Sequence, residues 1–121
     1  MQARDVTSWT EFTLPNATIA TGAAQSAAVD LSGFTLVGMH IPSNFDGTTI
    51  TVQVSPTLGG TYQNAQAASS ASTVYTITVA AGQYVPIENI AIVAGWQYIK
   101  LTAGTTQTTT DTIIPLAVRP V

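Results

Sequence analysis

The sequence lacks cysteine and has few charged side chains. Its 121 residues contain no cysteine, so disulfides and thiolate metal sites are excluded and stability must come from packing or assembly. Charged residues make up only 7% of the chain, against roughly 25% in an average soluble protein. Charge repulsion therefore contributes little to solubility, and we expect other subunits or partners to cover part of the surface. The alternative is a surface kept soluble by threonine and serine hydroxyls.

Basic residues are especially scarce, and the formal net charge is −3. Arg4, Lys100 and Arg119 are scattered along the chain, so no positive stripe can neutralise phosphates and we expect no nucleic-acid partner. The chain has no basic amphipathic segment and no apolar run of about 20 residues, so we expect no membrane partner. The N-terminal sequence lacks the apolar stretch of a Sec-type signal, which predicts a protein made in a cytoplasm.

Alternation of polar and apolar side chains is the dominant pattern in the chain. In residues 48–54 threonine and glutamine alternate with isoleucine and valine, which is typical of a strand with one buried face. A turn at Gly59-Gly60 and a short return strand at residues 61–62 follow. Residues 96–102 alternate similarly, with Trp96, Tyr98 and Lys100 on one face. Comparable patterns predict further strands at residues 6–14, 18–21, 26–31, 34–41, 74–79, 84–87 and 112–118.

Glycine and proline refine this prediction. We expect the apolar strand 34–41 to be central and buried on both sides, with a bulge or a close neighbour at Gly38. Pro86 predicts an edge strand, and Pro115 an edge or a bulge, because proline donates no ladder hydrogen bond. A short helix over the alanine-rich residues 23–28 is the alternative to a strand there. Three segments predict irregular structure: an exposed, mobile loop at 63–73, a loop or single helical turn at 88–94, and a polar turn at 103–110.

About eight short strands, turn signals every 8–12 residues or so and no convincing helix predict an all-β fold. We expect one domain over residues 1–121, built as an antiparallel β-sandwich or jelly roll.

No cluster of residues predicts catalysis, a cofactor or a metal. His40 is the only histidine and lies in an apolar strand, where a structural role is expected. No serine has a nucleophile-elbow context, and no two of the six carboxylates share a short motif. Asn44 and Asp46-Gly47 have the oxygen ligands that calcium takes, but the same residues form ordinary turns, which is the expected role.

Aromatic residues offer another kind of site. Trp9, Tyr62, Trp96 and Tyr98 could form a platform that contacts a partner or stacks against a glycan. Packing in the core or between subunits is the expected role of these side chains.

Four motifs carry a resemblance to a known class of proteins. They are GMHIP at residues 38–42, DGTTITVQVS at 46–55, GGTY at 59–62 and WQYIKLT at 96–102. In this order they resemble small virion proteins of tailed bacteriophages. The same order occurs in galactose-binding-like (discoidin-type) jelly rolls, which usually have more charged loops and often a disulfide. This chain has neither, which argues against sugar binding.

The resemblance implies a non-enzymatic virion protein, made in a host bacterial cytoplasm. The expected role is a capsid decoration or cement protein that binds the major capsid protein or other virion proteins as a dimer or trimer. Residues 1–10 are then expected to serve as an N-terminal docking arm. The alternatives are a tail, baseplate or head-fibre component, or a carbohydrate-binding module.

Overall fold

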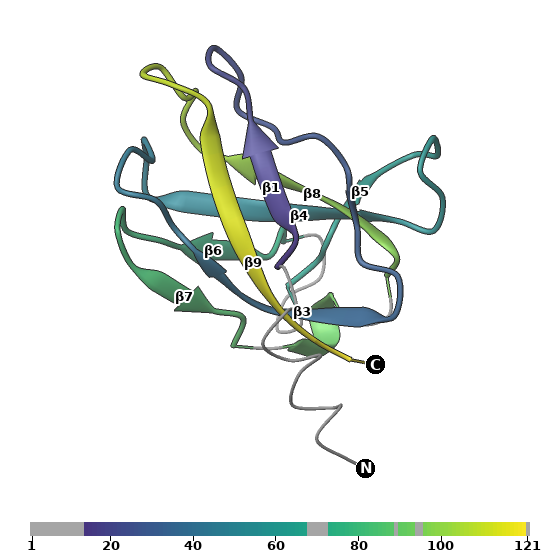
Figure 1. Ribbon diagram of the computed structural model, residues 1–121. Helices are drawn as coiled ribbons and strands as arrows, with labels where there is room; N and C mark the ends of the chain where they lie inside the picture. The colour runs from purple at the N-terminus through teal and green to yellow at the C-terminus, as the bar shows by residue number, and fades with distance from the viewer. Residues whose placement is uncertain (1–13, 68–72, 89, 94–95, 121) are drawn as a thin grey trace.

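Two antiparallel sheets lie face to face in the protein (Figure 1). The computed structural model describes residues 14–67, 73–88, 90–93 and 96–120. One sheet has the order β1-β9-β3-β7, with β1 (Asn16–Ile19), β9 (Thr112–Pro120), β3 (Phe34–His40) and β7 (Tyr84–Pro86). The other has the order β2-β8-β4-β5, with β6 also paired to β4; its strands are β2 (Val29–Asp30), β8 (Tyr98–Ala103), β4 (Thr49–Ser55), β5 (Gln63–Asn64) and β6 (Thr76–Thr78).

The strand pairing has the nested pattern of a jelly roll. β1 pairs with β9, β2 with β8, β3 with β7, and β4 with both β5 and β6. β5 and β6 lie end to end along the same side of β4, so they act as one interrupted edge strand. With that pair counted once, the described residues form eight strands wound into two sheets, as a jelly roll requires. The predicted fold class is therefore confirmed.

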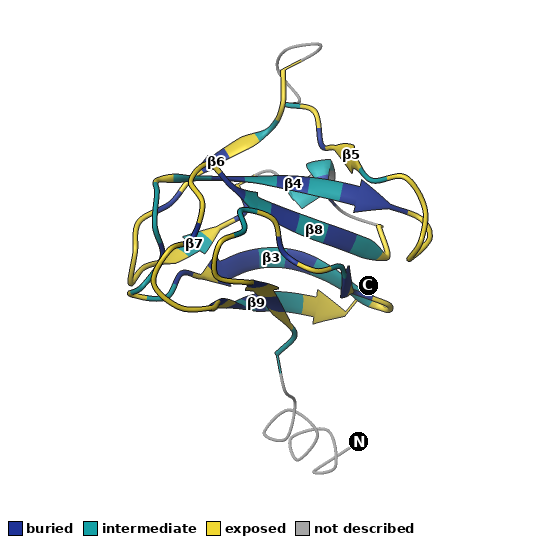
Figure 2. Cartoon of the chain, turned by 90° about the horizontal axis from the view of Figure 1, so that it is seen from above, coloured by how far each residue is buried: buried dark blue, intermediate teal, exposed yellow. Residues whose placement is uncertain are grey.

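The core lies between the sheets and follows the predicted alternation. Along β8, and along β4 up to Val54, the buried positions alternate with half-buried ones, as Figure 2 shows. Each large aliphatic side chain that is fully buried adds roughly 1.5–3 kcal/mol of favourable transfer free energy. The largest such side chains come from both sheets and are Ile19, Leu36, Met39, Ile50, Ile99, Leu101, Ile114 and Leu116.

β3 is central in its sheet but is buried on one face, not on both as predicted. The register with β9 shifts between Leu36 and Gly38, so Val37 is an extra residue in this strand. Because of this bulge, Leu36 and Met39 both point into the core although they are three positions apart. His40 lies on the outer face and is exposed. The bulge predicted at Gly38 is confirmed.

The two strand prolines behave differently. Pro86 lies in β7, at the edge of its sheet, as predicted. The expectation for Pro115 was wrong, because β9 is central and pairs with β1 and β3. The Leu116 N–H donates to the Pro15 carbonyl on the β1 side. Because successive N–H groups of a strand point to opposite sides, the nitrogen of Pro115 faces the β3 side. The ladder with β3 ends at the Met39–Leu116 pair, so no hydrogen bond is lost at Pro115.

The alanine-rich segment forms no helix. The carbonyls of Ala23 and Ala24 accept hydrogen bonds from Gln107 and Ala103, which lie far along the chain. These tertiary bonds use the carbonyls that a helix would need and override the propensity of alanine. The strands predicted on either side are shorter than expected or shifted: β1 ends at Ile19, and β2 contains only Val29 and Asp30.

The remaining predictions have mixed outcomes. The return strand starts at Gln63 rather than at residue 61, so the beginning of the predicted mobile loop belongs to the sheet, and Ala65 donates to the Val52 carbonyl. The single turn of helix expected in residues 88–94 is η1 (Ile90–Ile92). The predicted strand at residues 6–14 and the docking arm at residues 1–10 lie outside the described residues, apart from Leu14.

The polar segment after β8 contains a fully buried glutamine that the sequence does not signal. The Gln107 amide group donates to the carbonyls of Asp46 and Thr105 at 2.8 and 2.9 Å. Its oxygen accepts from the Asp46 N–H at 2.9 Å and from the Thr112 hydroxyl at 3.0 Å. All four hydrogen-bonding positions of this side chain are therefore used, as burial requires.

The backbone of Gln107 joins a third loop to this cluster. Its N–H donates to Ala23, and its carbonyl accepts from Gly22 at 2.7 Å. Gln107 thus joins the loop before β4, the loop after β1 and the start of β9. We name this group of bonds the Gln107 junction.

Replacing Gln107 by leucine should reduce the free energy of unfolding by about 3 kcal/mol. The substitution removes the side-chain partner of the Asp46 N–H and carbonyl, the Thr105 carbonyl and the Thr112 hydroxyl, whereas the backbone bonds to the loop after β1 remain. Each polar group left buried without a partner costs roughly 1–3 kcal/mol, although relaxation offsets part of the sum. Urea unfolding followed by circular dichroism measures the change. The exposed neighbour variant Thr109→Ala is the control and should stay within about 0.5 kcal/mol of the native protein. A loss below about 1 kcal/mol for Gln107→Leu would contradict a central role for the junction.

Candidate functional site

The outer face of the five-stranded sheet holds two of the predicted site residues. Tyr98 and Lys100 alternate with buried residues along β8 and therefore point outward. Lys100, Gln53 and Asn64 stand directly opposite one another across β8, β4 and β5, so they share this face. The ammonium group of Lys100 lies 4.4 Å from the centre of the Tyr62 ring, which places Tyr62 there too. We call this surface the outer polar face.

Side-chain amides form a ladder across the outer polar face. Gln25 donates to the Gln53 amide oxygen at 2.8 Å and to the Thr102 hydroxyl at 3.1 Å. Gln53 in turn donates to the Asn64 amide oxygen at 3.2 Å. The donors and acceptors used in this ladder are not free for a ligand, and they hold neighbouring strands in register.

Both tyrosines of this face are engaged within the chain. Lys100 covers one side of the Tyr62 ring, a cation–π contact, and the Tyr62 hydroxyl donates to the Leu58 carbonyl at 2.9 Å. The Tyr98 hydroxyl accepts from the Gln97 amide at 3.1 Å. Tyr62 therefore fixes the turn before β5 against the sheet.

The predicted aromatic platform is assembled only in part. Tyr62 and Tyr98 lie on the same face, and Trp96, with 38% of its surface exposed, lies just before β8. Trp9 is outside the described residues.

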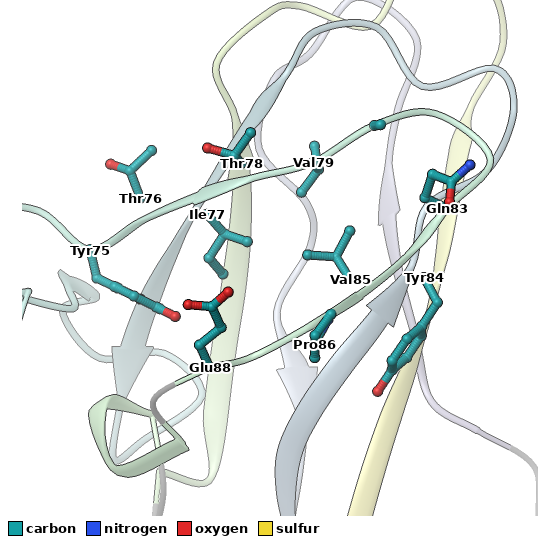
Figure 3. Close-up of a pocket in the computed structure, with 11 residues that line it drawn as sticks. Tyr75, Thr76, Ile77, Thr78, Val79, Gln83, Tyr84, Val85, Pro86 and Glu88 are labelled. Atoms are coloured by element: carbon teal, nitrogen blue, oxygen red, sulfur yellow. The ribbon is translucent and has the colours of Figure 1, made fainter.

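A groove with a volume of about 490 Å³ opens between β6 and β7, at the same side of both sheets (Figure 3). Ile77 and Val79 extend from the β6 side toward Val85 of β7, so its floor is apolar. Glu88 and Tyr75 approach each other at one end, and Glu88 is the only charged side chain in the lining. The groove has the size of a site for a small molecule or a peptide segment.

The Tyr84 side chain lies on the opposite side of β7 from this groove. Its ring is 4.8 Å from that of His40 and covers Gly38, where its hydroxyl occupies the place of a Cβ atom. The close neighbour predicted at Gly38 is therefore Tyr84. His40 is exposed on the outer face of β3, and its ring packs on that of Tyr84.

Asn44 lies in a turn after β3, and the side chains of Asn44 and Asp46 both bond to the loop before β9. Asn44 donates to the Thr110 hydroxyl at 2.8 Å, and the Asp46 carboxylate accepts from the N–H and hydroxyl of Thr108 at 3.0 and 3.1 Å. Gly47 follows with a φ of 106°, which favours glycine. Within the described part of the chain, no three His, Cys, Asp or Glu side chains group together in a way that could hold a metal ion. In the same residues no helix is long and apolar enough to cross a membrane.

Two exposed carboxylates hold loops through hydrogen bonds. The N–H and then the hydroxyl of Thr21, at 2.9 and 3.1 Å, lower the pKa of Asp111 from its ordinary value of 3.8. The hydroxyl and then the N–H of Ser32, at 2.6 and 2.9 Å, lower the pKa of Asp30 in the same way. The carboxylates of Asp30 and Asp111 therefore stabilise the loops whose N–H and hydroxyl groups they accept.

Comparisons with known proteins give no match: no protein-family model, no curated protein and no solved structure is similar to the chain. Function is therefore argued from the residues and their geometry. The groove and the Gln107 junction were not predicted from the sequence, because both depend on which strands become neighbours.

The lowered pKa values predict two independent loop titrations. Since the folded pKa lies below the unfolded one, each carboxylate contributes stability above about pH 4 that is lost as the pH falls through its folded pKa. Carboxyl NMR should give both midpoints below 3.8. Thr21→Val should raise the Asp111 midpoint alone, and Ser32→Ala should raise the Asp30 midpoint alone. Equal shifts of both carboxylates in either variant would contradict this assignment.

Gly38→Ala should be destabilising only while Tyr84 is present. The new methyl group displaces the Tyr84 ring from the sheet and from His40, at an expected cost of about 1 kcal/mol. A double-mutant cycle with Tyr84→Ala, followed by thermal unfolding, measures the coupling. If Gly38→Ala costs as much in the Tyr84→Ala protein, the backbone rather than the ring limits this position.

Proposed function

We propose that the protein is a non-enzymatic structural protein of a tailed-bacteriophage virion, namely a capsid decoration protein that stabilises the assembled shell. The observation that carries the proposal is the small number of free charges on the surface. Of the charged side chains in the described residues, Asp30, Asp46 and Asp111 are engaged by loop hydrogen bonds. The remaining ones are Glu88, Lys100 and Arg119.

A surface with few free charges can be buried against other proteins at a low cost in desolvation free energy. Burying a charge without a partner costs several kcal/mol or so, whereas hydroxyls and amides find hydrogen-bond partners across an interface. The centres of protein interfaces are accordingly poor in charged residues. A small domain with few free charges suits contacts on several sides, as in a lattice.

Exposed apolar side chains lie on both sheets and supply candidate anchors. Leu58, in the turn before β5, is 60% exposed, and Ile113 of β9 is 50% exposed. Trp96, before β8, adds an aromatic side chain of the type that dominates interface energies. Their distribution over two sheets fits a subunit held by more than one neighbour.

The mechanism follows from mass action. A protein that binds the assembled shell but not its separated subunits stabilises the shell by RT ln(1 + [L]/Kd). Repeated sites on a symmetric shell favour a symmetric dimer or trimer, because each subunit then meets an equivalent site.

The test is the copy number of the protein in purified virions. Quantitative mass spectrometry should find it in a small, fixed ratio to the major capsid protein. Particles lacking it should release DNA at a lower temperature, and the purified protein should restore the native temperature. A copy number equal to that of tail or baseplate subunits would favour that alternative. Absence from the virion would overturn the proposal.

A carbohydrate-binding module is the second candidate. The observation in its favour is that Tyr62 and Tyr98 share the outer polar face with an amide ladder. Against it, one side of the Tyr62 ring is covered by Lys100 and the ladder amides bond to one another. A glycan array tests this candidate. Glycan binding by the native protein that is abolished by Tyr98→Ala, with the fold intact, would favour a carbohydrate-binding module.

A further inference from the structure

The edge of β6 carries backbone groups that point away from its sheet. Val79 donates to the Thr48 carbonyl, and Ile77 stands opposite Ile50, so residues 77 and 79 face β4. By the alternation of an antiparallel ladder, the N–H and C=O groups of Thr76 and Thr78 point outward. No proline, charge or bulge protects this edge, in contrast to β7, whose Pro86 blunts it.

The groove lies beside this edge. An extended strand added to β6 would continue the five-stranded sheet and direct alternate side chains toward the apolar floor of Ile77, Val79 and Val85. Recognition by strand addition works in this way: the edge supplies main-chain bonds, and a groove accepts alternate side chains.

The N-terminal sequence fits such a strand. Residues 6–10 are uncharged, and three of the five are β-branched, as suits a strand. By the alternation of a strand, Val6 and Phe12 share one face and Trp9 lies on the other. Val6 and Phe12 are therefore the apolar side chains that can enter the groove together. The alternation of polar and apolar side chains in residues 6–14 predicts a strand in this segment.

The length of the N-terminal segment decides whether it can pair with β6 of the same copy or only with β6 of a second copy. One row of neighbouring residues crosses the four-stranded sheet: Pro15, Leu116, Met39 and Val85. Val85 lines the groove, so Pro15 lies at the same height along the strands but at the opposite edge of the sheet. The way to β6 of the same copy is three strand spacings and one sheet separation, about 25 Å. Such a path takes about seven or eight extended residues counted back from Pro15, which leaves about residues 1–6 to pair. Of those residues, MQARDV, only Val6 belongs to the predicted strand.

We propose that residues 6–13 of one copy add as a strand to β6 of a second copy and place side chains in its groove. In this arrangement the residues with the strand pattern do the pairing, and an exchange that is reciprocal or that completes a ring yields a closed oligomer. The inference deepens the proposed function, since it names the contact that joins copies. It needs no virion, so it can fail while shell binding stands.

The experiment combines oligomer mass with peptide binding. Size-exclusion chromatography with light scattering should show a dimer or trimer for the full chain and a monomer for a variant lacking residues 1–13. That variant should bind a fluorescein-labelled peptide of residues 4–14, measured by anisotropy. Thr78→Pro removes an outward N–H without breaking the β4 ladder and should weaken peptide binding at least about tenfold. Thr78→Val keeps the N–H and is the matched control.

Thr78→Pro in the full chain repeats the test without truncation and should also yield monomers, with circular dichroism confirming the fold. Three outcomes would overturn the inference: a full chain that is monomeric at every concentration, an oligomer that survives loss of residues 1–13, or equal peptide binding by Thr78→Pro and Thr78→Val.

Discussion

The buried amide of Gln107 is the constraint on which this end of the sandwich depends. A jelly roll places strands that are distant in sequence next to one another, so its loops must be held in position by contacts other than local turns. Gln107 provides them by bonding Asp46 from the β3–β4 connection, Thr112 at the start of β9 and the backbone after β1. Because a half-satisfied buried amide is costly, this position favours one arrangement of the loops over all others.

The sequence predicted the positions of the strands better than it predicted which strands pair with one another. Alternation in residues 48–54 and 96–102 identified β4 and β8, because each strand has one face in the core and one in solvent. Pro115 was misassigned for a physical reason: proline excludes a hydrogen bond on one side only, and that side of β9 lies just past the end of its ladder with β3. Gln107 was missed because nothing local distinguishes a buried glutamine from its exposed threonine neighbours.

The candidate sites show the same division. Placing Tyr98 and Lys100 on one face required only the period of a strand, whereas placing Tyr62 under Lys100 required the pairing of β5 with β4. The groove depends on β6 and β7 ending their respective sheets on the same side, a property of the winding that no single segment carries. Sequence patterns therefore identified faces, and topology brought them together.

The two edges beside the groove differ in a way that bears on function. Pro86 has its nitrogen on the outer side of β7, so it removes an edge donor at no cost to the ladder with β3. β6 is equally short and has threonines where a charge or proline would serve the same purpose. The outer edge of β7 is thus blunted by Pro86, whereas the outer N–H and C=O groups of β6 remain able to take the strand proposed above.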